Sequence, residues 1–283
     1  MTVSYQGQDV EVVRLKEIFK NQPTTVEFRK SDLTTGVELD GATLTVLDKD
    51  GNEIDKWTSV KGEPHIIKRL HVGETYILRE EFAPYGYLKA EEVEFTITDT
   101  AEIQKVEMKD DVPIGRIIIN KKGEFLSEVS WNDMVAGAMD SIWGYVTGSL
   151  KDVTFEIYAR EDIKAADGES DDYYKKDELV ATVTTDEMGI AKVENLPVGK
   201  YYVVEAGTAY GYVLDDEPRY VDLTYRDQDT PVVVYDEDWQ NNRQRAVVSV
   251  LKKEKDSDRV LEGAIFGLYT KEDILSASGK VLI

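Results

Sequence analysis

Residues 73–87 read GETYILREEFAPYGY, and residues 199–212 repeat the pattern as GKYYVVEAGTAYGY. A second motif recurs without gaps, because LKDVTFEIYAREDI at residues 150–163 aligns with LEGAIFGLYTKEDI at residues 261–274. Both are related to LDGATLTVL at residues 39–47. Self-similarity of this kind predicts a tandem array of structural units, each with the same fold.

Apolar and polar residues alternate through most of the chain, as in VEFRK at residues 26–30 and VEFTI at residues 93–97. Clusters of turn residues separate these runs. One of them, DKDG at residues 48–51, we interpret as a hairpin turn in preference to a calcium loop. A period of two residues with turns at short intervals predicts an all-β chain built from β-sandwiches.

The composition excludes several classes of protein. The 283 residues include 34 Lys and Arg against 56 Asp and Glu, a net charge of −22, which repels nucleic acid and anionic membranes. The chain has no Cys, so disulfides, thiolate metal sites and a Cys nucleophile are excluded. His65 and His71 lack the spacing of a metal motif, and no apolar run of about 18 residues occurs. We therefore expect no nucleic-acid partner, no metal, no cofactor and no membrane insertion.

Two further motifs set the boundaries of the units. A strand ending in Lys precedes each L-x-G-A-like segment, and a short apolar strand ending in Asp or Asn closes each unit. This order predicts the last strands of a truncated preceding domain at 1–24, a complete domain at 25–112, a second complete domain at 113–244 with an insertion at about 124–149, and the truncated start of a third domain at 245–283. We therefore expect a fragment of a longer array, with the signal and anchor outside the fragment.

Polar side chains share the apolar face of several predicted strands. Residues of equal parity point to the same side of a strand, so Lys30 faces the same way as Val26 and Phe28. The same reasoning gives the core of each complete unit one Lys, one Glu and one Asp or Asn: Lys30, Glu80 and Asp110 in the first, and Lys121, Glu205 and Asn241 in the second.

A buried Lys is costly unless it is paired, so one interpretation is a buried Lys–Glu salt bridge with a third polar partner. The other interpretation is covalent. Desolvation favours the neutral amine of Lys and the neutral acid of Glu, so the amine can attack the side-chain carbonyl carbon of Asp or Asn. The product is an amide, formed with loss of water or ammonia.

The motifs K-x-D, L-x-G-A and Y-x-L-x-E-x-x-A-P-x-G-Y, followed by a closing Asp or Asn, resemble the collagen-adhesin B-type (Cna-B, prealbumin-like) repeat domains of Gram-positive surface adhesins and pilins. The resemblance extends over almost the whole chain. It implies tandem Ig-like, prealbumin-like β-sandwiches with intramolecular isopeptide bonds. By resemblance, these bonds join Lys30 to Asp110 with assistance from Glu80, and Lys121 to Asn241 with assistance from Glu205.

The second unit departs from the family pattern in three places. Asp152-Val153 replaces Gly-Ala, Ala209 replaces the Pro of A-P-x-G-Y, and the insertion follows the Lys strand. Asn21 and Lys252 are unpaired remnants of incomplete units, and we expect them to stay unlinked because neither has a Glu of its own.

The resemblance implies a structural stalk segment of an extracellular, cell-wall-attached surface adhesin or pilin-like protein, whose partners are neighbouring repeat domains of the same array. It implies no enzyme activity beyond single-turnover bond formation. The alternative is a ligand-binding adhesin module that recognises a host extracellular-matrix protein or glycan through residues 127–148. There, WNDMVAGAMDSIWGY at residues 131–145 predicts a loop that exposes aromatic residues, or else a lid over the unit's own core.

Overall fold

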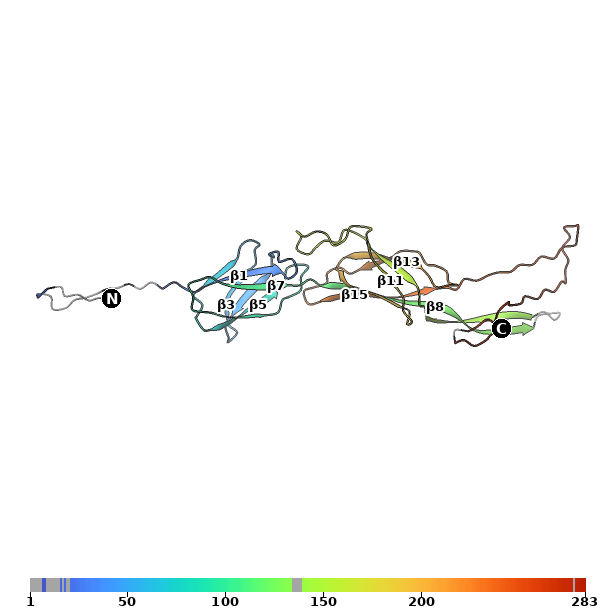
Figure 1. Ribbon diagram of the computed structural model, residues 1–283, viewed down its shortest axis with the longest axis horizontal. Coiled ribbons are helices and arrows are strands. Elements are labelled where there is room, and N and C mark those ends of the chain that lie inside the picture. Colours follow the sequence, from blue (N-terminus) through green and yellow to red (C-terminus); the bar gives the residue numbers. More distant parts are fainter. Residues whose placement is uncertain (1–6, 9–15, 17, 19–20, 134–138, 277) are drawn as a thin grey trace. The chain divides into compact units, whose positions relative to one another are not determined.

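The computed structural model describes residues 7–8, 16, 18, 21–133, 139–276 and 278–283. This part of the chain contains fifteen β-strands and no helix, so the predicted all-β fold is confirmed (Figure 1). In particular, the described residues include no helix able to cross a membrane. The chain forms two compact units, Met1–Asp111 and Val112–Ile283, which we call unit one and unit two.

Unit one is a β-sandwich of two sheets, with strand orders β4-β1-β7 and β3-β2-β5-β6. Apolar side chains from both sheets form its core, including Phe28, Leu44, Leu78 and Met108. The alternation of the sequence explains this core, because every second residue of a strand points between the sheets. The strands are β1 (Thr25–Asp32), β2 (Thr43–Leu47), β3 (Glu53–Thr58), β4 (His65–Lys68), β5 (Thr75–Phe82), β6 (Val93–Thr96) and β7 (Gln104–Asp110).

Unit two repeats this topology, with strand orders β12-β8-β15 and β11-β10-β13-β14. Its core contains larger aromatic side chains, among them Phe155 and Trp239, whose rings meet edge to face at 5.1 Å. One strand, β9, pairs with β8 outside the shared topology. The strands are β8 (Ile114–Asp133), β9 (Met139–Ser149), β10 (Thr154–Ala159), β11 (Leu179–Thr184), β12 (Ile190–Pro197), β13 (Lys200–Gly207), β14 (Arg219–Asp222) and β15 (Val232–Asn241).

The first and last strands of each unit are parallel neighbours. In unit one, β1 pairs with β7 so that Lys30 lies opposite Met108 and Asp32 lies opposite Asp110. In unit two, β8 pairs with β15 so that Lys121 lies opposite Trp239. In both units the Asp or Asn at the end of the last strand stands two residues beyond the partner of the Lys. The two side chains therefore share one face of the sheet at adjacent positions.

The insertion in unit two is a β-hairpin, so the predicted loop is wrong. β8 continues past Lys121 to Asp133 and pairs antiparallel with β9 (Figure 1). In unit one the equivalent strand ends at Asp32, whose carboxylate accepts hydrogen bonds from the next turn. Unit two has Gly123 at this position, where a Cβ would lie 2.7 Å from Cε1 of Tyr212. Unit two therefore has no carboxylate at this position that could accept the N–H groups of a turn.

The replacement of Gly-Ala by Asp152-Val153 leaves the turn unchanged. Asp152 takes a φ of 60°, in the same left-handed region as the 86° of Gly41. The N–H of Val153 donates to the hydroxyl of Thr185, as the N–H of Ala42 donates to the hydroxyl of Ser59. Asp is one of the few L-residues that adopt this conformation at low cost.

The predicted Lys strand before the third L-x-G-A-like motif does not form. Described residues from 245 onward contain only isolated bridges, such as Lys253 with Val260. Val248 and Val250 are 64% and 58% exposed, and the described residues form no sheet that covers them. Most of the strand expected within residues 1–24 lies outside the described residues, and the four predicted domain ranges stay predictions.

Candidate functional site

Unit one brings Lys30, Glu80 and Asp110 together in its core. Lys30 lies on β1, Glu80 on β5 and Asp110 on β7, and all three are at most 3% exposed. The Nζ of Lys30 donates a hydrogen bond to Oδ1 of Asp110 and lies 3.0 Å from Oε1 of Glu80. The N–H of Ala90 donates to Oε2 of Glu80 at 2.7 Å and fixes this carboxyl group.

The unit-one cluster holds two carboxyl groups against one amine. Burial raises the pKa of Asp110 from its ordinary value of 3.8 to about 7; Lys30 opposes this shift and Glu80 adds to it. Oδ2 of Asp110 is buried and accepts no hydrogen bond from a described donor, and a hydrogen bond with the side chain of Glu80 favours the protonated acid. A protonated Asp110 is therefore accessible near neutral pH, and this is the form whose hydroxyl can leave as water.

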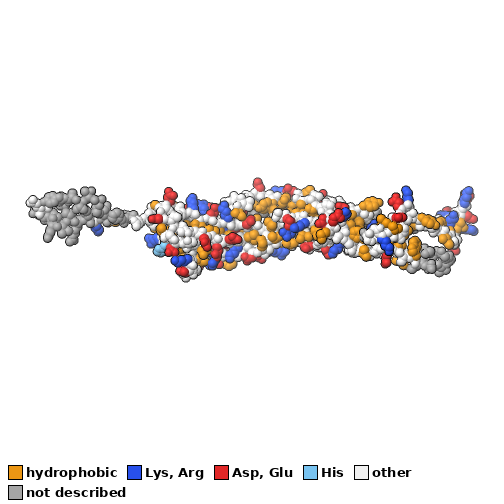
Figure 2. Space-filling model, turned by 60° about the horizontal axis from the view of Figure 1, so that its bottom comes forward, with side chains coloured by type: hydrophobic (Ala, Val, Ile, Leu, Met, Phe, Trp, Pro, Cys, Tyr) orange, Lys and Arg blue, Asp and Glu red, His pale blue; other side chains and the backbone are white. Residues whose placement is uncertain are grey.

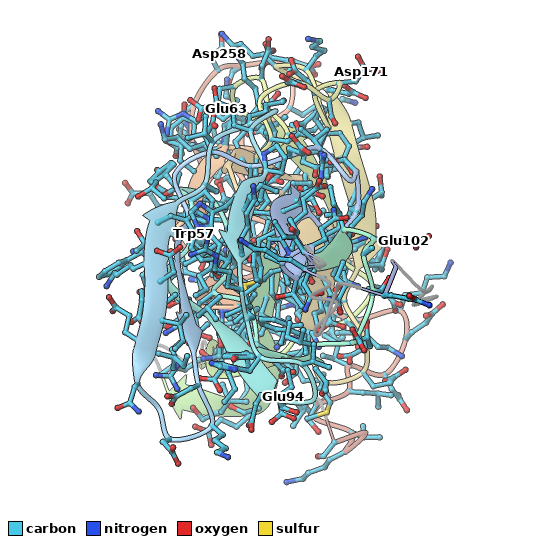
Figure 3. All side chains as sticks on the ribbon, turned by 90° about the vertical axis from the view of Figure 1, so that its left-hand side faces the viewer. Trp57, Glu63, Glu94, Glu102, Asp171 and Asp258 are labelled. Carbon is cyan, nitrogen blue, oxygen red and sulfur yellow. The ribbon has the colours of Figure 1, made fainter. Side chains whose placement is uncertain are left out.

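Three other acidic side chains of unit one, by contrast, lie at the surface. Figure 3 shows Glu63, Glu94 and Glu102 at the rim of the ribbon, and all three are exposed. Figure 2 shows acidic, basic and hydrophobic side chains interspersed over the face that it presents. Burial therefore distinguishes Glu80 and Asp110 from these surface carboxylates.

Unit two brings Lys121, Glu205 and Asn241 together in the same way. They lie on β8, β13 and β15, and each is 1% exposed. The Nζ of Lys121 is 2.5 Å from Oε2 of Glu205 and 2.7 Å from Oδ1 of Asn241. The Nδ2 of Asn241 donates to Oε1 of Glu205. Glu205 thus contacts both the amine and the carboxamide nitrogen.

Aromatic rings enclose the amine of unit two. The Nζ of Lys121 lies 5.6 Å from the ring centre of Phe155 and 5.8 Å from that of Trp239. Burial lowers the pKa of Lys121, although the hydrogen bond and charge of Glu205 act in the opposite direction. A lower pKa increases the fraction of Lys121 that is neutral at physiological pH, and the neutral amine is the nucleophilic form.

Both clusters can do the same chemistry. A Lys amine faces a carboxyl or carboxamide group, and a Glu carboxyl group that can accept and return a proton touches the amine. This is the arrangement for aminolysis with general acid–base assistance, and it also fits a stable buried ion pair.

The remaining candidate residues lie elsewhere. Asn21 and Lys252 are exposed and belong to neither cluster. The carboxylate of Asp48 accepts the N–H groups of Asp50 and Asn52 between β2 and β3, as expected for a hairpin turn. The described residues include no group of three or more His, Cys, Asp or Glu side chains that could hold a metal ion.

Sequence reasoning missed two contacts in these clusters. The N–H of Ala90 holds Glu80, and no side-chain pattern can reveal a backbone donor. The hydroxyl of Thr208 accepts a hydrogen bond from Asn241 in unit two. Thr208 lies one residue past the end of β13, where the parity argument for strands no longer applies.

Fold and sites together define tandem prealbumin-like β-sandwiches in which a Lys of the first strand meets an Asp or Asn of the last. The chain belongs to the family of SpaA prealbumin-like fold domains, whose model matches residues 24–112 and 145–238. The predicted family resemblance is thereby confirmed. The first match contains Lys30, Glu80 and Asp110; the second contains Glu205 but begins after Lys121 and ends before Asn241.

Several solved structures are similar to the chain. The Bacillus anthracis TIE protein is 25% identical, with a TM-score of 0.48, over 78% of this chain and 34% of that one. A streptococcal ancillary pilin is 16% identical, with a TM-score of 0.30, over 81% and 64%. BcpA, the major pilin subunit of Bacillus cereus, is 14% identical, with a TM-score of 0.30, over 79% and 100%.

The chain thus spans about a third of the length of the TIE protein and under two thirds of the ancillary pilin. No curated protein matches the sequence.

Proposed function

We propose that the chain is a structural stalk segment of an extracellular, cell-wall-attached adhesin or pilin-like protein, whose units close themselves with Lys30–Asp110 and Lys121–Asn241 amide bonds. One observation carries the proposal: the same buried Lys–Glu–acceptor cluster joins the first and last strands in both units. Membership of the SpaA prealbumin-like family supports it. Neighbouring repeat domains are the expected partners, and each bond forms once without turnover.

In unit one, the neutral amine of Lys30 attacks the side-chain carbonyl carbon of protonated Asp110. The new C–N bond forms, and the C–O bond to the carboxyl hydroxyl breaks. Glu80 takes a proton from the attacking nitrogen and delivers it to the departing oxygen, which leaves as water. Glu80 ends in the protonation state in which it began.

In unit two, Lys121 attacks the carboxamide carbon of Asn241 in the same manner, and the leaving group is ammonia. Glu205 contacts Nζ of Lys121 with one oxygen and Nδ2 of Asn241 with the other. It can therefore pass the proton directly from the nucleophile to the leaving nitrogen.

The bonds close long loops. Lys30 and Asp110 are separated by 80 positions, and Lys121 and Asn241 by 120. A cross-link over loops of this size stabilises the fold by about 4–5 kcal/mol through the entropy of the unfolded chain. Unlike a disulfide, an amide is not opened by reductants, which suits a stalk outside the cell.

A second candidate function, recognition of a host extracellular-matrix protein or glycan, is favoured by the β8–β9 hairpin. Trp131, Ile142 and Trp143 are between 37% and 52% exposed on it. At its base, Leu126 is buried and Phe125 packs against the core of unit two. The base therefore covers the unit's own core, whereas the outer part offers an apolar surface.

The intact mass of the purified, denatured chain tests the proposal. We expect the mass to fall below the sequence mass by one water, from Asp110, and one ammonia, from Asn241. Peptide mapping should recover Lys30 joined to Asp110 and Lys121 joined to Asn241. An unmodified mass would show that both clusters are ion pairs only.

A further inference from the structure

The carboxamide of Asn241 is held at three points. Its Oδ1 accepts a hydrogen bond from Lys121, and its Nδ2 donates to Glu205. The second N–H of Nδ2 donates to Oγ1 of Thr208 at 2.8 Å. A buried amide with every one of these groups paired has one defined orientation.

Strand register identifies the residue of unit one that corresponds to Thr208. Glu205 lies opposite Phe155 on β10, and the register then shifts by one residue before Gly207. Glu80 lies opposite Leu44 on β2, and the register shifts in the same way before Phe82. Thr208 and Ala83, the residues that follow Gly207 and Phe82, are therefore equivalent.

The two units differ both at this position and in the acceptor residue of the proposed bond. Unit one has Ala83, which offers no side-chain oxygen, together with Asp110, whose Oδ2 accepts no hydrogen bond from a described donor. Unit two has Thr208 together with Asn241, whose Nδ2 is fully paired.

An Asn acceptor has a problem of orientation that an Asp acceptor does not have. Either oxygen of an Asp carboxyl group can carry the proton and leave as water, whereas a carboxamide turned by half a rotation would direct its NH₂ group at the amine of Lys121. That orientation sets Oδ1 of Asn241 against the carboxylate of Glu205 and moves the leaving nitrogen away from it. In the reactive orientation the hydroxyl of Thr208 accepts the second N–H of Nδ2 and holds this nitrogen beside Glu205.

We propose that Thr208 is a positioning residue that adapts unit two to an Asn acceptor, an inference that rests on the proposed amide bond. During the reaction the bond from Nζ of Lys121 to Cγ of Asn241 forms and the bond from Cγ to Nδ2 breaks. Glu205 carries the proton from Nζ to Nδ2, which leaves as ammonia. Thr208 exchanges no proton; it orients Nδ2 until the bond breaks.

Refolding kinetics test this role. The full chain is isolated unfolded and unlinked under denaturing conditions after brief expression, then refolded, and the bonds are followed by intact mass and peptide mapping. Water loss from unit one in the same molecules is the internal reference. Thr208→Val retains the shape and removes the acceptor, and should slow ammonia loss about tenfold, as expected for one lost hydrogen bond. Thr208→Ser should restore the rate.

An Asp acceptor distinguishes a positioning role from a structural one. If Thr208 only supported the fold, Thr208→Val would slow bond formation equally with an Asn and with an Asp acceptor. In the Asn241→Asp background unit two loses water, and Thr208→Val should change this rate less than twofold. Equal slowing with Asn and Asp acceptors, or no slowing with Asn, would overturn the role of Thr208 while leaving the amide bond intact. A wild-type chain that refolds and loses no ammonia would overturn the bond and the inference together.

Unit one allows the reciprocal experiment, which does not depend on the folding of a Thr208 variant. Asp110→Asn gives unit one an Asn acceptor beside Ala83. Adding Ala83→Thr should increase its rate of ammonia loss, with unit two as the unchanged reference. No increase would count against the inference.

Discussion

At the scale of single residues, the two units perform one proposed reaction with different hydrogen-bond arrangements. Oε2 of Glu80 accepts the N–H of Ala90, so Oε1 is the oxygen next to Lys30. Both oxygens of Glu205 contact the reacting groups. The Asp acceptor of unit one can take up its own proton, because burial raises its pKa to about 7. The Asn acceptor cannot, and it depends on delivery of a proton to its nitrogen.

Glu80→Gln should leave unit one folded and unlinked. Gln matches Glu in size but cannot take the proton from Lys30, so the loss of water should disappear while unit two still loses ammonia. Intact mass distinguishes the two losses within one molecule. Glu81→Gln is the matched control, because Glu81 lies next in the chain and outside the cluster, and it should retain both losses. Water loss in Glu80→Gln would assign the proton transfer to another group.

At the scale of elements, shortening the β8–β9 hairpin tests the proposed stalk function against the proposed binding function. Leu126 lies opposite Tyr145, so a two-residue Asn-Gly turn can replace residues 127–144 and close the hairpin. The replacement keeps Phe125 and Leu126 at the core and removes Trp131 and Trp143.

For this shortened hairpin we expect unchanged ammonia loss and a change in unfolding free energy of less than about 1 kcal/mol, because the removed segment is largely exposed. Intact mass and denaturant unfolding measure both. Wild-type and shortened chains should also give the same response on a glycan array and on immobilised extracellular-matrix proteins. A signal of the wild-type chain that the shortened chain loses would favour the binding function.

The elements also show how far the sequence is predictive. Alternation located the core strands, and the repeats together with residue parity identified Lys30, Glu80 and Asp110 as one buried group. The hairpin was missed because WNDMVAGAMDSIWGY contains Gly137 and Gly144 and no sustained alternation, and because its strands are stabilised by each other. Thr208 was detectable only by comparing the repeats position by position, with Thr208 against Ala83 beside Asn241 against Asp110.

At the scale of the whole molecule, the proposed bonds lie on the route of the chain. β7 ends at Asp110 and β8 begins at Ile114, so the chain leaves unit one by the strand paired with β1 and enters unit two by the strand that carries Lys121. Tension would enter each unit through its first strand and leave through its last. The proposed amide between these strands would carry this tension, so that the residues between the two linked positions would not be extended.

The dependence of stability on pH distinguishes the linked chain from an unlinked one, for which we use Glu80→Gln/Glu205→Gln. In the unlinked chain Asp110 keeps its carboxyl group, and burial, the main cause of its raised pKa, remains. An acid whose pKa is higher in the folded state binds its proton more tightly there. Its contribution is therefore complete below the ordinary pKa of 3.8 and is lost as the pH rises through about 7.

A shift of the pKa from 3.8 to about 7 corresponds to about 4 kcal/mol, and the variant lacks Glu80, which adds to this shift. The unfolding free energy of unit one in the unlinked chain should therefore fall by up to about 4 kcal/mol as the pH rises through this window. In the wild-type chain the carboxyl group of Asp110 has become an amide, which does not titrate, so this fall should be absent. Denaturant unfolding of both chains at a series of pH values gives the difference, in which the surface carboxylates common to both chains cancel. Parallel curves for the two chains would mean that Asp110 titrates in both, and therefore that the bond of unit one is not formed.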